Sequence, residues 1–308
     1  MKNNLKVSRL VVCLAVMACA TFGLRVPAQR PMPIVVAPKI TKDVVYGSAA
    51  LPTPDKPPLQ LKLDIYEPQG FRGRRPGVLM AHGGGWVFGD KAEYAKFGTA
   101  LAEKGYVAFS INYRLLPTFP HPAQIDDAQR AMRWIRVHAA DYNLDPKRIG
   151  ALGDSAGGHL VSLLGTWDTR DNSAPELAKF SSKANCVVDL YGPSDFTVPA
   201  TQTTAQGLQL ITLFFGGKTQ EQAMDTYREG SPVAHVDRHS APFLIMHGDK
   251  DPLVPISQSE RLNKALKDAK VESTLVVFPN EGHGFTTAAD QEKRDQLALA
   301  FLKKHLRP

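Results

Sequence analysis

One serine of this chain lies in a setting that favours nucleophilic chemistry, within Gly153–Gly157 (Gly-Asp-Ser-Ala-Gly). Residues 148–152 before it are typical of a short buried strand, and residues 158–164 after it are typical of the start of a helix. A serine at such a strand-to-helix turn needs small neighbours, because the backbone there is strained and crowded. The turn raises the hydroxyl out of the sheet, so Ser155 is the predicted nucleophile of an acyl transfer.

A run of three glycines, in His82–Trp86 (His-Gly-Gly-Gly-Trp), follows the apolar strand pattern of residues 77–81. Consecutive glycines let the backbone approach a ligand closely and turn its N–H groups outward. In acyl transfer the carbonyl oxygen gains negative charge, and N–H donors directed at it contribute strongly to the rate. We expect Gly83, Gly84 and Ala156 to supply these donors, with the helix dipole adding to the last. The alternative is a glycine-rich turn that only closes a strand.

The general base should be a histidine, and in chains with such an elbow an acid and then a histidine follow the serine. Five of the histidines after Ser155 have ordinary settings in helices, a strand end or a polar connection, and these are His159, His235, His239, His247 and His305. His283 instead lies in a glycine-containing loop after the strand pattern of residues 274–278. A catalytic imidazole is expected at such a position, so His283 is the predicted base.

The acid should follow the preceding strand, where the chain offers Asp249 and Asp251. Asp251 lies farther into the loop, before Pro252, where it can reach the Nδ1 side of His283 and fix its tautomer. Asp249 is the competing candidate, and its alternative role is an Asx-turn. The residues favour Asp251.

Composition limits the classes of function. The chain has 308 residues and 43% hydrophobic residues, enough for one large α/β domain or two small ones. Its formal charge of +7 falls to +3 without the four basic residues of segment 1–28, and no basic stripe with interleaved aromatic residues points to nucleic acid. No Cys/His cluster indicates a metal site, and we expect no cofactor.

The N-terminus has the pattern of a secretory signal peptide over residues 1–28. Three basic residues precede an apolar run, residues 10–24, which is too short to span a bilayer comfortably. Ala28 is a plausible cleavage site, whereas Cys19 is the rival as the lipidated residue of an imperfect lipoprotein box. An uncleaved anchor is the third reading. Cleavage would leave Cys186 alone, so no intrachain disulfide is expected, and the protein would be secreted or periplasmic.

Apolar segments alternate with helical patterns along the rest of the chain. This order predicts one mostly parallel, eight-stranded sheet with helices on both faces, in a single domain over residues 42–308 after a lead-in over residues 29–41. The first two strands resemble an antiparallel hairpin. The predicted strands are 44–48, 59–66, 78–81, 106–112, 149–152, 186–191, 243–247 and 274–278, and the clearest helices are 94–104, 122–142 and 290–305.

Residues 197–238 are the least regular part of this pattern. They contain a polar stretch, an apolar stretch and a segment compatible with a helix. Such an insertion can form a small cap over an active site, or it can be a surface excursion that touches no substrate. The residues leave both readings open.

Taken together, these motifs resemble α/β-hydrolase serine esterases. The resemblance is to the branch shared by hormone-sensitive-lipase-like carboxylesterases and bacterial secreted acetyl-xylan and feruloyl esterases, and it covers residues 42–306. The segments that carry it are His82–Trp86, Asn112–Leu115, Asp127 to Trp134, Gly153–Leu160, Ser231–Val233, His247–Asp251 and Gly282–Phe285. It implies a catalytic triad of Ser155, Asp251 and His283, and structural roles for Arg114 and Asp127.

The resemblance also implies a serine carboxylesterase that removes short acyl groups from plant polysaccharide, of the acetyl-xylan or feruloyl type. The expected partner is a small-molecule or oligosaccharide ester, with Trp86 either a wall for the acyl or sugar group or a core residue. The alternatives are a general short-chain carboxylesterase, a formamidase-like hydrolase, and a non-catalytic scaffold. A prolyl-peptidase-type enzyme would need a large accessory domain for which this chain has no room.

Overall fold

Eight strands form a single sheet in the computed structural model, which describes residues 36–53, 55–199 and 202–308. The strand order is β1-β2-β4-β3-β5-β6-β7-β8. β2 runs antiparallel to both β1 and β4, and the remaining neighbours are parallel, so the predicted sheet is confirmed. The strands are β1 Lys39–Ala49, β2 Leu59–Glu67, β3 Arg75–Ala81, β4 Val107–Ile111, β5 Leu144–Asp154, β6 Val187–Leu190, β7 Phe243–Gly248 and β8 Ser273–Phe278.

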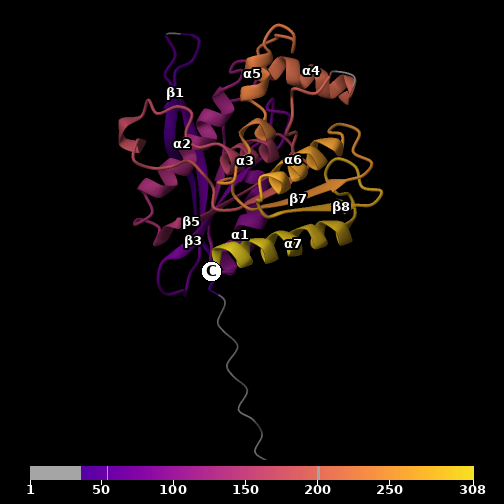
Figure 1. The fold of residues 1–308 in the computed structure, drawn as a ribbon. Coiled ribbons are helices and arrows are strands. Elements are labelled where there is room, and N and C mark those ends of the chain that lie inside the picture. Colours follow the sequence, from indigo (N-terminus) through magenta and orange to yellow (C-terminus); the bar gives the residue numbers. More distant parts are fainter. Residues whose placement is uncertain (1–35, 54, 200–201) are drawn as a thin grey trace, which may run out of the picture. The chain divides into compact units, whose positions relative to one another are not determined.

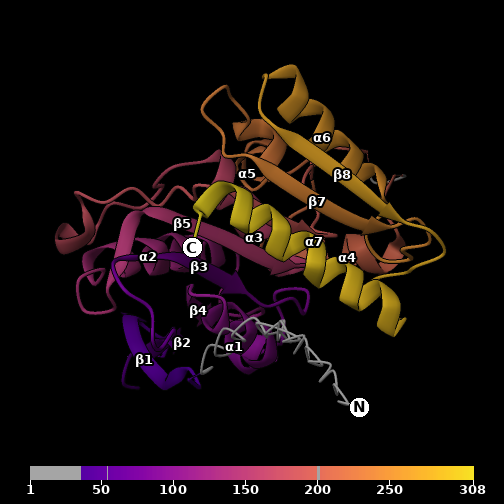
Figure 2. The same cartoon turned by 90° about the horizontal axis from the view of Figure 1, so that it is seen from below.

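Helices cover both faces of the sheet. In Figure 1, α6 and α7 lie on opposite sides of β7 and β8, and Figure 2 shows α7 crossing the face that α1 also covers. The α-helices are α1 Ala95–Glu103, α2 Ala123–Val137, α3 Ala156–Thr166, α4 Ala205–Phe214, α5 Met224–Glu229, α6 Ser257–Asp268 and α7 Ala288–Leu306, and the 3₁₀ helices are η1 Lys91–Tyr94, η2 Pro175–Leu177 and η4 Pro232–His235.

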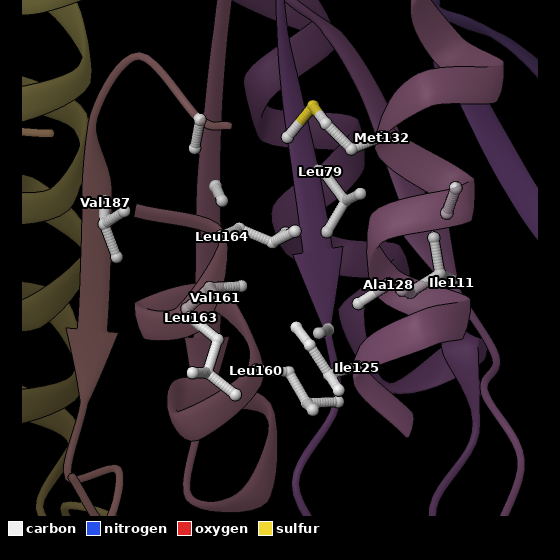
Figure 3. Packing of buried hydrophobic residues seen from close by; sticks show 14 of the residues in the cluster. Leu79, Ile111, Ile125, Ala128, Met132, Leu160, Val161, Leu163, Leu164 and Val187 are labelled. Atoms are coloured by element: carbon white, nitrogen blue, oxygen red, sulfur yellow. The ribbon is translucent and has the colours of Figure 1, made fainter. Parts of the chain in front are cut away.

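The larger hydrophobic core lies between the sheet and the layer of α2, α3 and α6. Figure 3 shows Leu164 of α3 and Met132 of α2 lying next to Leu79 of β3, and Leu160 of α3 lying next to Ile125 of α2 in the same layer. α3 is buried along its whole length, because it lies between the sheet and α2. The helix that begins directly after Ser155 is therefore held rigidly by apolar packing.

Three element boundaries differ clearly from the prediction. α2 ends at Val137, five residues before the predicted end, because the chain turns here: the His138 carbonyl accepts from Asp141 N–H and Asn143 adopts a φ of 50°. β5 then begins at Leu144, earlier than predicted. β1 begins at Lys39, inside the predicted lead-in.

A buried ion pair joins α2 to the segment after β4. The Arg114 guanidinium donates to both carboxylate oxygens of Asp127 at 2.7–3.0 Å, and the Arg114 backbone N–H donates to the same carboxylate at 2.8 Å. The Asp127 side chain is completely buried, so this pairing satisfies a charge that burial would otherwise make costly. These contacts give both residues the structural role expected from the sequence.

The stretch between β6 and β7 contains α4 and α5, which project beyond α3 and α6 (Figure 1). Thr204 caps α4 by accepting a hydrogen bond from the Gly207 N–H at 3.0 Å. Its hydroxyl also lies 3.2 Å from the Leu253 carbonyl oxygen, which ties the start of α4 to the loop after β7. At the other end, Phe214 and Phe215 are buried and anchor α4 to the core.

Candidate active site

Ser155 occupies a strained turn between β5 and α3. Its φ of 51° and ψ of −118° place a non-glycine residue at positive φ, which costs free energy and is held here by the surrounding structure. Its backbone N–H donates to the Leu190 carbonyl at 2.8 Å, and its carbonyl accepts from His159 N–H at 2.9 Å. These two bonds fix the turn on both sides of the hydroxyl.

The glycines of the turn are required by close packing. A Cβ added at Gly153 would collide with the Gly157 carbonyl, and one added at Gly157 would collide with the Ala81 carbonyl at the end of β3. A Cβ at Gly83 would likewise meet the Asp154 carboxylate. The absence of side chains at these glycines therefore brings the glycine loop directly against the serine turn.

His283 lies within hydrogen-bond distance of both predicted partners. Its Nε2 is 2.8 Å from the Ser155 Oγ, and its Nδ1 is 2.7 Å from the Asp251 Oδ2. The ring packs against Tyr191 with 4.7 Å between centroids, and its side chain is 20% exposed. A partly exposed imidazole in this position can exchange protons with a bound substrate while remaining oriented.

Glu281 shapes the loop that presents His283. Its carboxylate accepts hydrogen bonds from the backbone N–H groups of Thr286 and Thr287, at 2.7 and 3.1 Å, and from the Thr286 hydroxyl at 2.9 Å. These donors, the Thr286 N–H first, lower the pKa of Glu281 to about 2. The Glu281 carboxylate, two residues before the candidate base, thus holds the loop from β8 to α7 together through these hydrogen bonds.

Asp251, and not Asp249, contacts His283. The second oxygen of Asp251, Oδ1, accepts from the N–H groups of Leu253 and Val254, both at 2.8 Å, and its side chain is fully buried. Burial raises the pKa of Asp251, but hydrogen bonds from His247 and His283 outweigh this effect and hold the pKa well below its usual range. Asp249 is exposed, and its carboxylate accepts from Asn280 N–H at 2.6 Å.

His247 is a supporting residue whose place in the sequence indicates only the end of a strand. Its Nε2 lies 3.2 Å from the Asp251 Oδ2 and 2.9 Å from the Val254 carbonyl, and its Nδ1 lies 2.7 Å from the Ser259 hydroxyl. The carbonyl can only accept, so Nε2 carries the proton and donates it to Val254, while the Asp251 carboxylate lies close enough at 3.2 Å to attract the same proton. In the sequence, the signal for this contact is that His247 precedes Asp251 by four residues.

The glycine loop has the geometry to expose N–H groups. Gly84 and Gly85 have φ values of 97° and 59°, which favour glycine, and the Gly84 carbonyl accepts from the N–H groups of Val87 and Phe88 at 3.0 and 3.2 Å. Among the described residues, no backbone hydrogen bond of a turn or cap is donated by the N–H groups of Gly83, Gly84 or Ala156. Ala156 begins α3, so its free N–H also lies at the positive end of the helix dipole.

An apolar pocket opens beside Ser155. It encloses about 480 Å³, including the space at its mouth. One wall comes from α4 and another from the loop after β7, so segments distant in sequence meet here. The lining residues are Gly85, Trp86, Ser155, Ala156, Pro193, Thr203, Gly207, Leu210, Ile211, Leu253, Val254, Pro255 and Gln258.

Trp86 belongs to both the pocket wall and the core. Its side chain is only 3% exposed, and its ring lies 4.4 Å from Phe214 and 5.4 Å from His159 between centroids. Its indole Nε1 has no hydrogen-bond partner among the described residues. The structure therefore places Trp86 in the core and at the pocket wall, and a contact with the acyl or sugar group stays a prediction.

The described part of the chain contains neither a cluster of side chains suited to a metal ion nor a helix suited to span a membrane. There, no group of three or more His, Cys, Asp or Glu side chains is arranged to hold a metal ion. Of the helices in the described ranges, none combines the length and the apolar character needed to cross a membrane. Cys186 is buried and free, whereas the predicted signal peptide and Cys19 lie outside the described residues.

Comparison with known proteins places this geometry in context. The profile of the BD-FAE family matches residues 63–266. Esterase LipQ of Mycobacterium tuberculosis is 31% identical over 258 residues, which cover 82% of this chain and 59% of LipQ. The chain spans between 50% and 59% of the length of three curated relatives that it matches, Esterase LipQ among them.

Two solved structures resemble the whole described fold. A truncated carbohydrate esterase from gut microbiota superposes with a TM-score of 0.74 at 26% identity, covering 89% of this chain and 99% of the other. The butyrate-bound esterase Est2 of the planctomycete Thermogutta terrifontis superposes with a TM-score of 0.70 at 26% identity, covering 88% and 95%. Both similar structures are those of ester-hydrolysing enzymes.

Proposed function

Because the chain belongs to the BD-FAE family of α/β-hydrolase carboxylesterases, we propose that it hydrolyses carboxylic esters through an acyl-enzyme on Ser155. The observation that carries this proposal is the pair of hydrogen bonds made by His283, at 2.8 Å to Ser155 and 2.7 Å to Asp251. A serine, an imidazole and a carboxylate connected in this order form the constellation that activates a hydroxyl for attack.

The reaction follows from the positions of these groups. His283 Nε2 takes the proton of the Ser155 hydroxyl as Oγ attacks the ester carbonyl, and Asp251 stabilises the resulting imidazolium. The N–H groups of Gly83, Gly84 and Ala156 hold the oxygen that becomes negative. The tetrahedral intermediate expels the alcohol, which takes its proton from His283. Water, activated by the same imidazole, then attacks the acyl-enzyme and releases the carboxylic acid and the free serine.

The acyl group is assigned to the apolar pocket beside Ser155. Leu210 and Ile211 of α4 form part of its wall, and this supports a cap role for the insertion over residues 197–238. Because residues of α4 form one wall of this pocket, we expect it to accept short acyl groups best. The butyrate bound to the Thermogutta Est2 structure is a group of this size.

The natural substrate in this proposal is a short acyl ester on plant polysaccharide, of the acetyl-xylan or feruloyl type. Support comes from the similar carbohydrate esterase of gut microbiota and from the export signal expected in residues 1–28, which would deliver the enzyme to extracytoplasmic polymers. The apolar character of the pocket equally favours a second candidate, a general short-chain carboxylesterase that does not select the alcohol.

Release of acetate from acetylated xylan tests the proposal, measured beside hydrolysis of p-nitrophenyl acetate and p-nitrophenyl octanoate. We expect acetate release by the wild-type protein and its loss, by several orders of magnitude, in a folded Ser155→Ala variant. Activity on the nitrophenyl esters alone would support the general carboxylesterase. Near-full activity of folded Ser155→Ala on any ester would contradict the assignment of the nucleophile.

A further inference from the structure

Phe88 lies two residues after Trp86, at the end of the glycine loop, and it has no role in the proposed reaction. Phe88 is 69% exposed, the largest fraction among the exposed large hydrophobic side chains of the described residues. A single exposed apolar residue is common on protein surfaces and by itself has no meaning. The position of Phe88 is what distinguishes it, because it lies three residues after Gly85 in the loop that borders Ser155.

The ring of Phe88 is held against the loop that is proposed to bind the oxyanion. A Cβ added at Gly84 would lie 3.0 Å from the Phe88 Cδ2, and the Phe88 N–H donates to the Gly84 carbonyl at 3.2 Å. The turn at Gly84 therefore also fixes the backbone position from which the Phe88 side chain extends.

The backbone after Phe88 is fixed as well. Gly89 has a φ of 116°, and an added Cβ there would collide with the buried ring of His82. Asp90 then caps η1, accepting from Ala92 N–H at 2.8 Å while its own N–H donates to Glu93 at 2.9 Å. An exposed ring on a backbone fixed on both sides loses little conformational freedom when a ligand covers it.

Adjacent glycines of the loop face different surroundings. Gly85 faces Leu210, whose methyl carbons lie 3.3 Å from the position of an added Cβ, and Leu210 lines the apolar pocket. Gly84 faces Phe88, which is exposed and is not part of the pocket lining. With the acyl group in the pocket, the alcohol portion of an ester must extend away from it, toward solvent.

From this arrangement we propose that Phe88 is a binding platform for the alcohol portion of the ester, and that it takes the C–H face of a pyranose ring. An exposed phenyl ring offers a flat apolar surface with a negative π face, which complements the weakly positive C–H groups of a sugar ring. This inference rests on the proposed attack by Ser155, and it adds a specificity residue for the leaving group.

Binding of xylotetraose tests the platform independently of turnover, with titration followed by NMR in the full chain. We expect Phe88→Ala to weaken the Kd about fivefold, the effect of losing one ring contact, and Phe88→Tyr to retain it. Phe71→Ala is the matched control, because Phe71 is 42% exposed and packs on Arg75 at the start of β3. An unchanged Kd in Phe88→Ala, or no binding by the wild type, would overturn the proposal.

Hydrolysis of two acetates provides the kinetic counterpart. Cyclohexyl acetate carries a saturated ring in its alcohol and ethyl acetate does not, so the ratio of their kcat/KM values isolates the contact with the ring. We expect this ratio to fall about fivefold in Phe88→Ala and to stay unchanged in Phe71→Ala. An equal loss on both esters would show that Phe88 only supports the loop, and would overturn the platform. Absence of wild-type hydrolysis would contradict the proposed function and leave the binding result to decide on Phe88.

Discussion

At the scale of single residues, the orientation of His283 depends on the charge of Asp251. The carboxylate receives hydrogen bonds from two histidines and two backbone N–H groups, and these keep it ionised although it is buried. An ionised Asp251 can only accept, so Nδ1 of His283 must carry the proton and Nε2 is left free to act as a base.

The first prediction concerns the need for an ionised Asp251 to hold the proton on Nδ1 of His283. Asp251→Asn keeps the shape of the side chain but can present an N–H₂ group to His283, which favours the wrong tautomer of the imidazole. We expect kcat on p-nitrophenyl acetate to fall by about three orders of magnitude, with the far-UV circular dichroism unchanged. Asp249→Asn is the matched control, since Asp249 contacts Asn280 instead. A loss in the control equal to that in Asp251→Asn would reassign the acid.

The sequence predicted Ser155, His283 and Asp251 because each follows a recognisable strand, and such positions converge at the carboxyl ends of parallel strands. It did not predict the role of His247, because the apolar run of β7 explains that residue without any partner. The contact with Asp251 arises only when the loop after β7 folds back on the end of the strand. Trp86 stayed ambiguous for a related reason, since an indole large enough to line a pocket also fills a core.

At the scale of elements, α4 forms one wall of the apolar pocket. Leu210 closes the wall opposite Gly85, and truncation to alanine would lengthen the space for an acyl chain. We expect Leu210→Ala to raise the ratio of kcat/KM for p-nitrophenyl octanoate over p-nitrophenyl acetate about tenfold. Leu213→Ala serves as the control, because Leu213 lies on the same helix, is 37% exposed and is absent from the lining. An unchanged ratio in Leu210→Ala would place the acyl group elsewhere.

The far end of α4 is anchored by a buried aromatic cluster that includes a histidine. The ring of His121 lies 5.2 and 5.3 Å from those of Phe214 and Phe215, and neither of its nitrogens has a hydrogen-bond partner among the described residues. Burial, followed by the positive charge of Arg170, lowers the pKa of His121 to about 3. The side chain is therefore neutral in the folded state at ordinary pH.

This burial gives a pH dependence of stability with a defined sign. In the unfolded chain the pKa of His121 returns to about 6.5, so between pH 3 and 6.5 the unfolded state binds a proton that the folded state does not. The free energy of unfolding therefore falls as the pH is lowered through this window. Replacing His121 with phenylalanine removes the contribution of this side chain to the pH dependence of the free energy of unfolding.

Urea unfolding of wild type and His121→Phe at pH 6.5 and pH 4.5 measures the effect. We expect the stability of the wild type, relative to the variant, to drop by about 2 kcal/mol between the two pH values. The comparison cancels the titration of all groups that the two proteins share. If the free energy of unfolding changed equally with pH in the two proteins, the pKa of His121 would be the same in the folded and unfolded states.

Apolar runs predicted the strands well, because buried parallel strands are continuously hydrophobic. The end of α2 was harder to predict, since Ala139 and Tyr142 fit the apolar face of a helix and the turn depends on Asn143 adopting positive φ. The insertion over residues 197–238 could not be assigned from its own residues. Its contact with the site depends on the loop after β7, to which Thr204 is tied.

At the scale of the whole molecule, the sheet brings together groups from widely separated parts of the chain. Ser155 follows β5, Asp251 follows β7 and His283 follows β8, while the glycine loop follows β3. The fold and the nature of the reaction follow from this convergence. The alcohol and the acyl chain of the natural ester do not, because they depend on single side chains such as Leu210 in the pocket wall and the proposed platform Phe88.

The most direct test of the account is covalent labelling of the intact chain with a fluorophosphonate, followed by peptide mapping with mass spectrometry. Because the reagent requires a serine activated by a neighbouring base, we expect a single phosphonylated residue, Ser155, and no label in a folded Ser155→Ala variant. A label on another serine, or an unlabelled Ser155 in folded wild-type protein, would contradict the proposed nucleophile.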